Sequence, residues 1–416
     1  NYHNSLDYRW NNPSHGSYTG GDSVHTHFVV DGFVMENNTF IANLDRATGD
    51  INFNGLGIYI GGQTWTALTL GRTAEFHNIT IRNNTTTMDS TSSGTLNFTG
   101  YFQSTGSFGI PVGNTDMEHA LVIDNVIFEG NVLTLTALFG TVSVSAHGLN
   151  VNNGGYSGNF TEAKYGNSPY LITNYTARNN TTSWESVKNS STVAVALSLG
   201  NGNFHVTDSM FENNRNESGN ASAFYTNASN AYTIEITNST FANNYAALGG
   251  SAFYLTTGVQ FYGDTLTVVD NTAGGIATFT DHSGRGGAIQ ITNDDTRVHF
   301  NNSTFLNNAV ENENGGSLAY MTNKSYIYFT NSTIVNTGNY GIICNANNLQ
   351  YLYLANSIMV GAAIADTNKT QNRIINSVYG KVISGNSQFI SANNKSNASV
   401  LDIFGTNRLT FKTDAE

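Results

Sequence analysis

The carboxylates and basic residues that could carry chemistry gather in one stretch of the second half of the chain. They are Asp264, Asp270, Asp281, Asp294, Asp295, His282, Arg285, Arg297 and His299. A glycosidase needs two carboxylates roughly 5–9.5 Å apart across a cleft. A uronate lyase typically combines a basic residue with calcium-binding carboxylates. No motif here fixes either arrangement, so we expect polar loops and assign no catalytic residue.

The early histidines could bind a metal ion. His25 and His27 would share one face of a strand, with His3 and His15 upstream. Two neutral imidazoles and a carboxylate can bind zinc. No third ligand follows at a diagnostic spacing. We therefore expect histidines of a capping segment, with no metal and no cofactor.

Aromatic residues form the third candidate, because several strands alternate in the same way. Aligning these strands predicts one outward column of side chains on successive coils, comprising His205, Glu235, His299, Tyr328 and Tyr353. A second column beside it would contain Tyr326 and Tyr351. Such a surface suits stacking with sugars or contact with another protein. The candidate ligand-binding residues are therefore Tyr326, Tyr328, Tyr351, Tyr353 and His299. Alternatively, tyrosine is present for its high β propensity and stacks only on its own neighbours.

The strands that would position these residues recur around a short phrase, an apolar residue followed three positions later by asparagine. The phrase contains the pairs Phe211 and Asn214, Phe241 and Asn244, and Phe305 and Asn308. Further anchors are assigned to Val268, Ile334, Ile358 and Val378, giving separations between 20 and 37 residues. That variable period fits one turn of a parallel β-helix better than a propeller blade. Earlier echoes at Phe40 and Phe128 lie farther apart and predict larger insertions in the N-terminal half.

The repeated residues have a structural interpretation in such a coil. The apolar residue points inward, and the asparagine occupies a corner where it tolerates a left-handed backbone. Its amide would bond the asparagine one coil away, about 4.8 Å distant. Paired glycines, Gly286–Gly287 and Gly315–Gly316, precede strands and would allow positive φ and close approach of coils.

Composition sets the limits for the whole chain. Its 416 residues include 17 basic and 29 acidic side chains, a formal net charge of -12, which argues against nucleic acid and anionic membranes as partners. No apolar stretch approaches the about 20 residues that span a bilayer, so we expect no membrane insertion. Alternation of period two dominates and no helical pattern stands out.

We therefore predict an all-β fold, a single elongated domain formed by a right-handed parallel β-helix of roughly 14–17 coils, on the order of 70–80 Å long. Residues 1–35 would form an N-terminal capping segment, and residues 36–400 the helix. Residues 401–416 would form a C-terminal coil or cap.

The alternation of Gly-Gly-Ala-Ile-like and Phe-x-x-Asn phrases resembles the chlamydial polymorphic membrane proteins and related autotransporter passengers. The resemblance rests on Gly287-Ala288-Ile289 and on Phe211, Phe241 and Phe305, and covers about residues 200–400. It implies an extracellular adhesin with a role in virulence, secreted or anchored through an outer-membrane domain that is missing here. Its partner would be a cell-surface protein or glycan receptor, or a second copy. Two alternatives stay open: a polysaccharide-degrading lyase or hydrolase or phage-type spike, and a structural fibre or sheath protein.

Overall fold

The computed structural model describes most of the chain. The described residues are 6–9, 26–45, 48–61, 72–104, 108, 118–152, 170–186, 196–226, 228, 232–256, 258–274, 284–311, 315–335, 340–344, 350–360, 363–366, 371–379, 382–384 and 388–392. They contain strands and turns and no helix. His3, His15, His25, Asp281 and His282 lie outside them.

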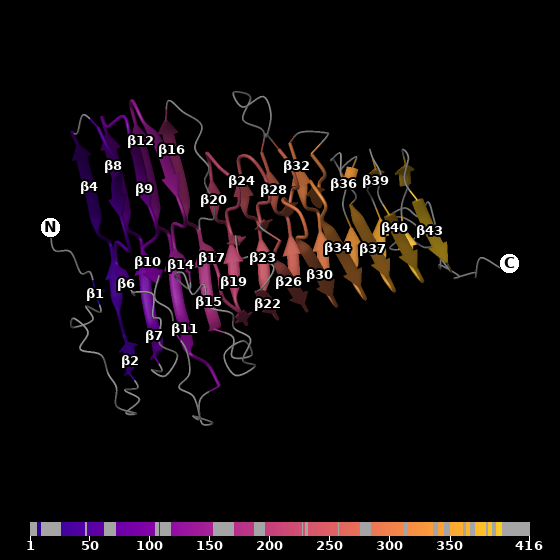
Figure 1. Cartoon of the computed structure of the whole chain (residues 1–416), viewed down its shortest axis with the longest axis horizontal. Coiled ribbons are helices and arrows are strands. Elements are labelled where there is room, and N and C mark those ends of the chain that lie inside the picture. Colours follow the sequence, from indigo (N-terminus) through magenta and orange to yellow (C-terminus); the bar gives the residue numbers. More distant parts are fainter. Residues whose placement is uncertain are drawn as a thin grey trace, which may run out of the picture.

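The strands stack into a parallel β-helix, in which successive coils add strands to sheets A and B along the whole described stack and to two smaller sheets in part of it (Figure 1). Sheet A contains β1 (Leu6–Arg9), β6 (Ile58–Gly61), β10 (Phe102–Ser104), β14 (Leu149–Val151), β17 (Leu197–Leu199), β21 (Phe224–Thr226), β25 (Phe253–Leu255), β29 (Ile289–Ile291), β33 (Ala319–Met321), β36 (Tyr340–Cys344), β39 (Ala363–Asp366) and β42 (Val382–Ser384). Neighbouring strands of this sheet run parallel, for example β25 with β29 and β29 with β33.

Sheet B is wider and bends at a corner. Its first row contains β2 (Thr26–Asp31), β7 (Arg72–Arg82), β11 (Leu121–Glu129), β15 (Tyr170–Arg178), β18 (Phe204–Thr207), β22 (Thr233–Thr237), β26 (Gln260–Asp264), β30 (Arg297–Asn301), β34 (Tyr326–Thr330), β37 (Tyr351–Ala355), β40 (Gln371–Ile375) and β43 (Gln388–Ala392). Its second row contains β3 (Val34–Glu36), β19 (Met210–Glu212), β23 (Thr240–Ala242), β27 (Thr267–Val269), β31 (Thr304–Leu306), β35 (Thr333–Val335), β38 (Ile358–Val360) and β41 (Val378–Tyr379). The long strands β7, β11 and β15 run through both rows: β7 pairs with β2 and β3, and β15 with β18 and β19.

Two smaller sheets complete the coils. Sheet C contains β4 (Thr39–Leu44), β8 (Thr85–Ser90), β12 (Val132–Ala137), β16 (Thr181–Ser186), β20 (Arg215–Asn216), β24 (Tyr245–Ala246), β28 (Thr272–Ala273) and β32 (Ala309–Val310). Sheet D contains β5 (Ile51–Phe53), β9 (Thr95–Phe98) and β13 (Thr141–Val144). The first strands of sheet C are visibly longer in Figure 1, with six residues in β12 against two in β24.

The described residues form fewer coils than the roughly 14–17 that the sequence predicts for the whole chain. Within them, sheet A has twelve strands. The described stack is therefore about 50–60 Å long at the usual strand spacing. The reason is that early coils are long: equivalent asparagines are 46, 47 and 49 residues apart there, and the added length forms strands of sheets C and D.

The apolar anchors stack in register across sheet B. Phe211 pairs with Phe241, and the column continues through Val268, Phe305 and Ile334. The assignment of Ile358 and Val378 to this column is wrong by one residue. Ile334 pairs with Met359, and Ile358 with Val378 in the neighbouring column. Two apolar residues follow Ser357, and the inward position belongs to the second.

Upstream, the column passes from Met35 through Ile81, Phe128 and Ala177. Phe40 is not part of it, although it was assigned as an anchor. Phe40 lies on β4 and pairs with Thr86 in sheet C. The coil starts its phrase earlier, with Met35 three residues before Asn38, and methionine fills the buried position that phenylalanine takes later.

The corner residue with a left-handed backbone is the one before the asparagine that ends the Phe-x-x-Asn phrase, and not that asparagine itself. Asn213, Asn243 and Asn307 have φ values of 54°, 53° and 52°. Asn214, Asn244 and Asn308 follow them and are buried, with 0 to 1% of their surface exposed. A second left-handed residue stands five positions earlier, at Asp208, Asn238 and Asn302. Each of these coils is thus bent twice across sheet B, at a fixed spacing.

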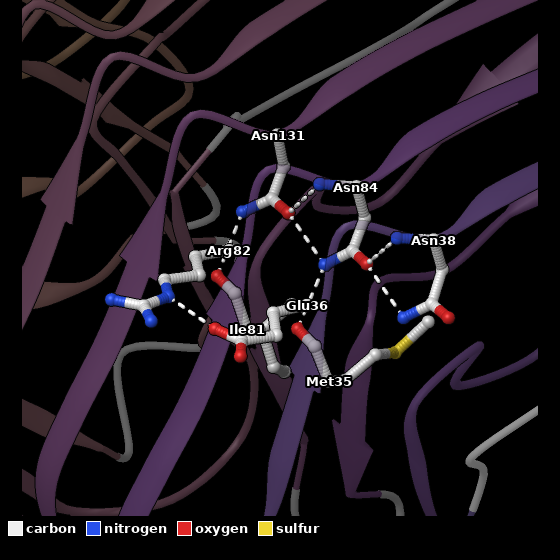
Figure 2. A network of polar contacts seen from close by, with 7 residues as sticks. All are labelled: Met35, Glu36, Asn38, Ile81, Arg82, Asn84 and Asn131. Atoms are coloured by element: carbon white, nitrogen blue, oxygen red, sulfur yellow. Dashed lines mark hydrogen bonds and ion pairs between the residues drawn. The ribbon is translucent and has the colours of Figure 1, made fainter.

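The buried asparagines form a continuous hydrogen-bonded ladder. Among the described residues, the ladder links Asn38, Asn84, Asn131, Asn180, Asn214, Asn244, Asn271 and Asn308 in this order. Each Nδ2 donates to the Oδ1 of the next asparagine at 2.8 to 3.1 Å. The second Nδ2 proton donates to a carbonyl of the preceding coil, as Asn84 does to Met35 and Asn131 to Ile81 (Figure 2). These buried amides are therefore paired on both sides, which removes the desolvation cost of burial.

The glycine pairs lie where coils approach each other closely. Gly286 and Gly316 have φ values of 67° and 74°. A Cβ added to Gly287 would lie 2.0 Å from the carbonyl oxygen of Ser317, and one added to Gly315 would lie 1.6 Å from that of Gly284. The backbone amide of Gly287 donates to Gly316 one coil on. Gly287 and Gly315 thus leave no room for a side chain, and the close backbone contact joins neighbouring coils just before the strands of sheet A.

Candidate binding surface

The outward column on the first row of sheet B brings the predicted residues together. His205 pairs with Glu235, and His299, Tyr328 and Tyr353 follow in register on successive coils. Tyr262 also belongs to the column, between Glu235 and His299, and sequence alignment missed it. The signal was hidden because Gly263 takes an inward position on β26 and breaks the apolar alternation used to align the strands.

Four rings of this column stack face to face. Their centroids are separated by 4.9 Å for Tyr262 and His299, 4.1 Å for His299 and Tyr328, and 4.5 Å for Tyr328 and Tyr353. The interplanar angles are 15°, 2° and 10°. The parallel register imposes this geometry, because identical rotamers repeat at the strand spacing.

A second stack runs beside the first. Tyr326 and Tyr351 are 4.4 Å apart at 4°, and the guanidinium of Arg297 lies 4.9 Å from the Tyr326 ring centroid. Arg297 and Tyr326 are register partners on adjacent coils. We define the aromatic face as the exposed residues Tyr262 and Arg297 with the half-buried residues His299, Tyr326, Tyr328, Tyr351 and Tyr353.

The stack controls which ring surface a partner can reach. A sugar ring stacks on an exposed aromatic face, but the faces of His299 and Tyr328 are covered by their neighbours. What remains exposed is a row of ring edges and phenol hydroxyls at the strand spacing. The inner rings of the stack therefore offer a partner edges and polar atoms rather than open faces, which suit hydrogen bonds to glycan hydroxyls or to a protein surface. The predicted stacking of sugars on this surface stays a prediction.

The pKa values of two side chains of the aromatic face, His299 and Tyr328, are shifted from their ordinary values. Partial burial, reinforced by the charge of Arg297, lowers the pKa of His299, so its neutral form is favoured within the stack. Burial, together with the neighbouring Tyr353, raises the pKa of Tyr328, which keeps its hydroxyl protonated and able to donate. The face thus carries one permanent cation, Arg297, among neutral donors near neutral pH.

A second aromatic column lies on sheet A and is buried over part of its length. Tyr225 and Tyr254 stack there at 5.6 Å, and Gln290 and Tyr320 continue the column. Only 6% of Gln290 and 2% of Tyr320 is exposed. By contrast, 40% of Tyr262 is exposed on sheet B. Tyr320 of sheet A is therefore closed to a partner, whereas Tyr225 and Tyr254 are half-buried like most tyrosines of sheet B.

The carboxylates considered for catalysis are already engaged or set apart. Asp264 accepts hydrogen bonds from the amides of Asn301 and Asn302 at 2.7 and 3.0 Å. Asp295 forms an ion pair with Lys324, and Asp294 accepts from the Lys324 backbone amide. Asp270 occupies a left-handed corner of the coil. These positions act as corner and ladder residues, and the described residues hold no pair facing a cleft among them.

Of the early histidines considered as metal ligands, His27 is described, and with His77 it lies beside carboxylates on the first row of sheet B. The imidazole of His27 lies 3.6 Å from Glu75, and His77 lies 3.0 Å from Glu75 and 3.6 Å from Asp124. The hydrogen bond with Glu75 is the main cause that raises the pKa of His77. Among the described residues, no group of three or more histidine, cysteine or acidic side chains is arranged to hold a metal ion.

A polar cluster inside the coils escaped the sequence analysis. His147 is fully buried and its Nδ1 lies 3.0 Å from the Thr182 hydroxyl, while Nε2 has no partner. The ring packs between Tyr101 and Phe128 at 5.4 and 5.1 Å. Burial lowers the pKa of His147 to about 3, so the imidazole is neutral in the folded protein.

No helix within the described ranges has the length and apolar character needed to cross a membrane. No family model, curated protein or solved structure matches this chain.

Proposed function

We propose that this chain is an extracellular surface adhesin, a β-helical passenger of the autotransporter type, that binds a receptor on host or neighbouring cells. The observation that carries the proposal is the aromatic face, an accessible row of stacked rings on a rigid parallel sheet. Tyrosine and arginine are enriched where proteins bind partners, because they combine large contact area with hydrogen bonding.

The surroundings of the row support a binding role. Its rings are held by the register of β26, β30, β34 and β37, so little side-chain entropy is lost when a partner docks. At the corner beside these strands, the backbone amides of Ser303 and Ser332 donate to the hydroxyls of Ser332 and Ser357 one coil on, a support separate from the exposed rings. The resemblance to polymorphic membrane proteins agrees with the fold and adds the cell-surface location to the proposal.

The test replaces Tyr328 and Tyr353 by serine in one variant and measures adhesion to cells. We expect a loss of at least tenfold in the concentration needed for half-maximal binding, since two central rings disappear. Leu138→Ser with Phe139→Ser is the matched control, because these exposed apolar side chains lie at the distant turn between β12 and β13. Unchanged adhesion by a folded tyrosine double variant would remove the aromatic face as the receptor site.

The two other functional classes are separated by simple assays on the same protein. Release of reducing or unsaturated ends from acidic polysaccharides, with or without calcium, would replace the adhesin proposal by an enzyme. Concentration-dependent assembly in analytical ultracentrifugation, abolished by the tyrosine double variant, would make a second copy the partner.

A further inference from the structure

The basic side chains of the described residues differ in whether they form an ion pair with a carboxylate. Four of them hold a carboxylate within ion-pair distance, at 2.5 to 3.1 Å: Arg82 with Glu36, Arg178 with Glu129, Arg215 with Glu217, and Lys324 with Asp295. Arg297 is exposed and forms no ion pair with any carboxylate in the described part of the chain. In a protein of net charge -12, an unpaired guanidinium in the middle of the aromatic face stands out.

The neighbours of Arg297 are hydrogen-bonding groups rather than acids. On its own strand, His299 points to the same side two residues on, and the register partners of Arg297 are Gln260 and Tyr326. The nearest carboxylates along the sheet are occupied: Asp264 by two asparagine amides and Asp295 by Lys324. Glu235 lies two coils before His299 in the outward column. The positive charge of the Arg297 guanidinium is therefore available to bind an anionic group of a ligand.

We propose that the aromatic face binds an acidic polysaccharide, with a uronate carboxylate on Arg297 and sugar hydroxyls along the row of tyrosine hydroxyls. The net charge of -12 disfavours polyanions elsewhere on the surface, so the contact depends on this one local guanidinium. This inference rests on the proposed function and names the ligand class of the same surface. Guanidinium binds carboxylate through two parallel hydrogen bonds, and its stacking on Tyr326 holds the fork in place.

A polysaccharide fits this surface better than an acidic protein segment because the surface is periodic. Phenol groups of Tyr262, Tyr328 and Tyr353, and of Tyr326 and Tyr351, repeat along the helix axis in two parallel rows. A sugar polymer presents hydroxyls and carboxylates with a period of its own, so many weak contacts can form along one line. Each contact is weak in water, and their number supplies the affinity.

The experiment uses immobilised polygalacturonate and its fully methyl-esterified form, which differ only in charge. At an ionic strength of about 0.15 M, where the repulsion from the net charge of -12 is largely screened, the whole protein is expected to bind the acidic polymer at least tenfold more tightly. Arg297→Gln should lose about tenfold in affinity for polygalacturonate, the factor expected for one charge-assisted pair. Arg297→Lys should recover part of the loss, because it keeps the charge without the fork.

Arg215→Gln is the matched control. Arg215 also lies over a tyrosine, 4.1 Å from the Tyr245 centroid, but it already holds Glu217. We expect this variant to bind polygalacturonate as the unmodified protein does. Equal loss in both arginine variants would mean that general positive charge is responsible, and would overturn the assignment of Arg297.

The outcomes separate this inference from the proposed function. If the tyrosine double variant loses cell adhesion while Arg297→Gln binds normally, or the esterified polymer binds equally well, the acidic ligand is wrong and the adhesin stands. Stronger binding of polyglutamate than of polygalacturonate would make the partner an acidic protein. If the unmodified protein binds neither cells nor any of these polymers, both proposals fail.

Discussion

The coils before residue 186 and those after residue 204 share one frame, the inward column and the asparagine ladder. Their outward surfaces on sheet B differ in chemical character. The asparagine ladder runs through both, from Asn38 to Asn308, with similar geometry. The outward column of the first row does not. In the early coils it holds Val29, Glu75, Val122 and Leu171, and in the late coils it holds mainly tyrosine and histidine.

The difference teaches that frame and surface vary independently. Early charges bind one another, as in the network of His77, Glu75 and Asp124, so that surface is satisfied internally. The late surface leaves a cation unpaired and a row of hydroxyls accessible. A parallel β-helix permits this separation because each outward residue contacts only its neighbours on adjacent coils, while the fold depends on the inward and corner positions.

The largest effect we expect comes from the shared frame. Asn244→Ala removes the bonds of Asn244 to Phe211 and Asn271 and strands the amide groups of Asn214. The free energy of unfolding should fall by about 4 kcal/mol, from several buried groups at roughly 1–3 kcal/mol each. Denaturant unfolding measures this change in free energy, and hydrogen exchange of the backbone amides in β19 and β23 shows whether it is local to these strands.

Asn38→Ala sharpens the comparison, because Asn38 ends the ladder and is only partly buried. It should cost no more than about 1 kcal/mol. Equal costs at both positions would mean that the ladder is not a continuous buried structure, and would break the claim of a common frame.

How far the sequence predicts this molecule depends on which residues carry the signal. The Phe-x-x-Asn phrase recurs because the inward column and the ladder repeat in every coil, so register followed for Phe211, Phe241 and Phe305. It failed at Met359, where two adjacent apolar residues fit the pattern equally well.

The early coils were harder because Met35, Ile81 and Ala177 replace phenylalanine and weaken the phrase. Two features of the candidate site depend on distances between coils, which no local pattern encodes. They are the face-to-face packing of the rings and the absence of an ion pair between Arg297 and a carboxylate of the described chain. The burial of His147 is likewise a property of the assembled coil.

The second effect concerns the interior of the early coils. The pKa of His147 falls from 6.5 in the unfolded chain to about 3 in the fold, so its contribution to stability is complete above pH 6.5 and is lost as pH falls toward 3. Between pH 6.5 and 5 this loss amounts to about 2 kcal/mol. Urea unfolding of the protein and of His147→Gln at both pH values measures it.

His147→Gln should lack that part of the pH dependence, since glutamine does not titrate and can still bond Thr182. An identical pH slope in the two proteins would show that the imidazole is not buried as described. The later coils provide a contrast, because His299 is partly exposed in the stack and its protonation costs less.

The third effect measures how much the aromatic face contributes to cohesion. Tyr328→Ser removes two stacked contacts, with His299 and Tyr353, and should lower the free energy of unfolding by about 1 kcal/mol. The change in denaturation midpoint gives this value directly. A cost approaching that of Asn244→Ala would make the stack part of the frame, and its loss of adhesion could then reflect unfolding.

The smallest effect lies on the early surface and has the opposite pH sign to that of His147. The hydrogen bond to Glu75 raises the pKa of His77 above 6.5, so its stabilisation is complete below pH 6.5 and is lost as pH rises through the raised value. His77→Gln should cost about 0.5 kcal/mol at pH 5.5 and nothing at pH 8.5, since the pair is partly exposed and screened. Unfolding at these two pH values, in low salt, measures the difference. A cost that persists at pH 8.5 would mean that His77 acts through packing, and the early surface would then not be held by paired charges as the comparison requires.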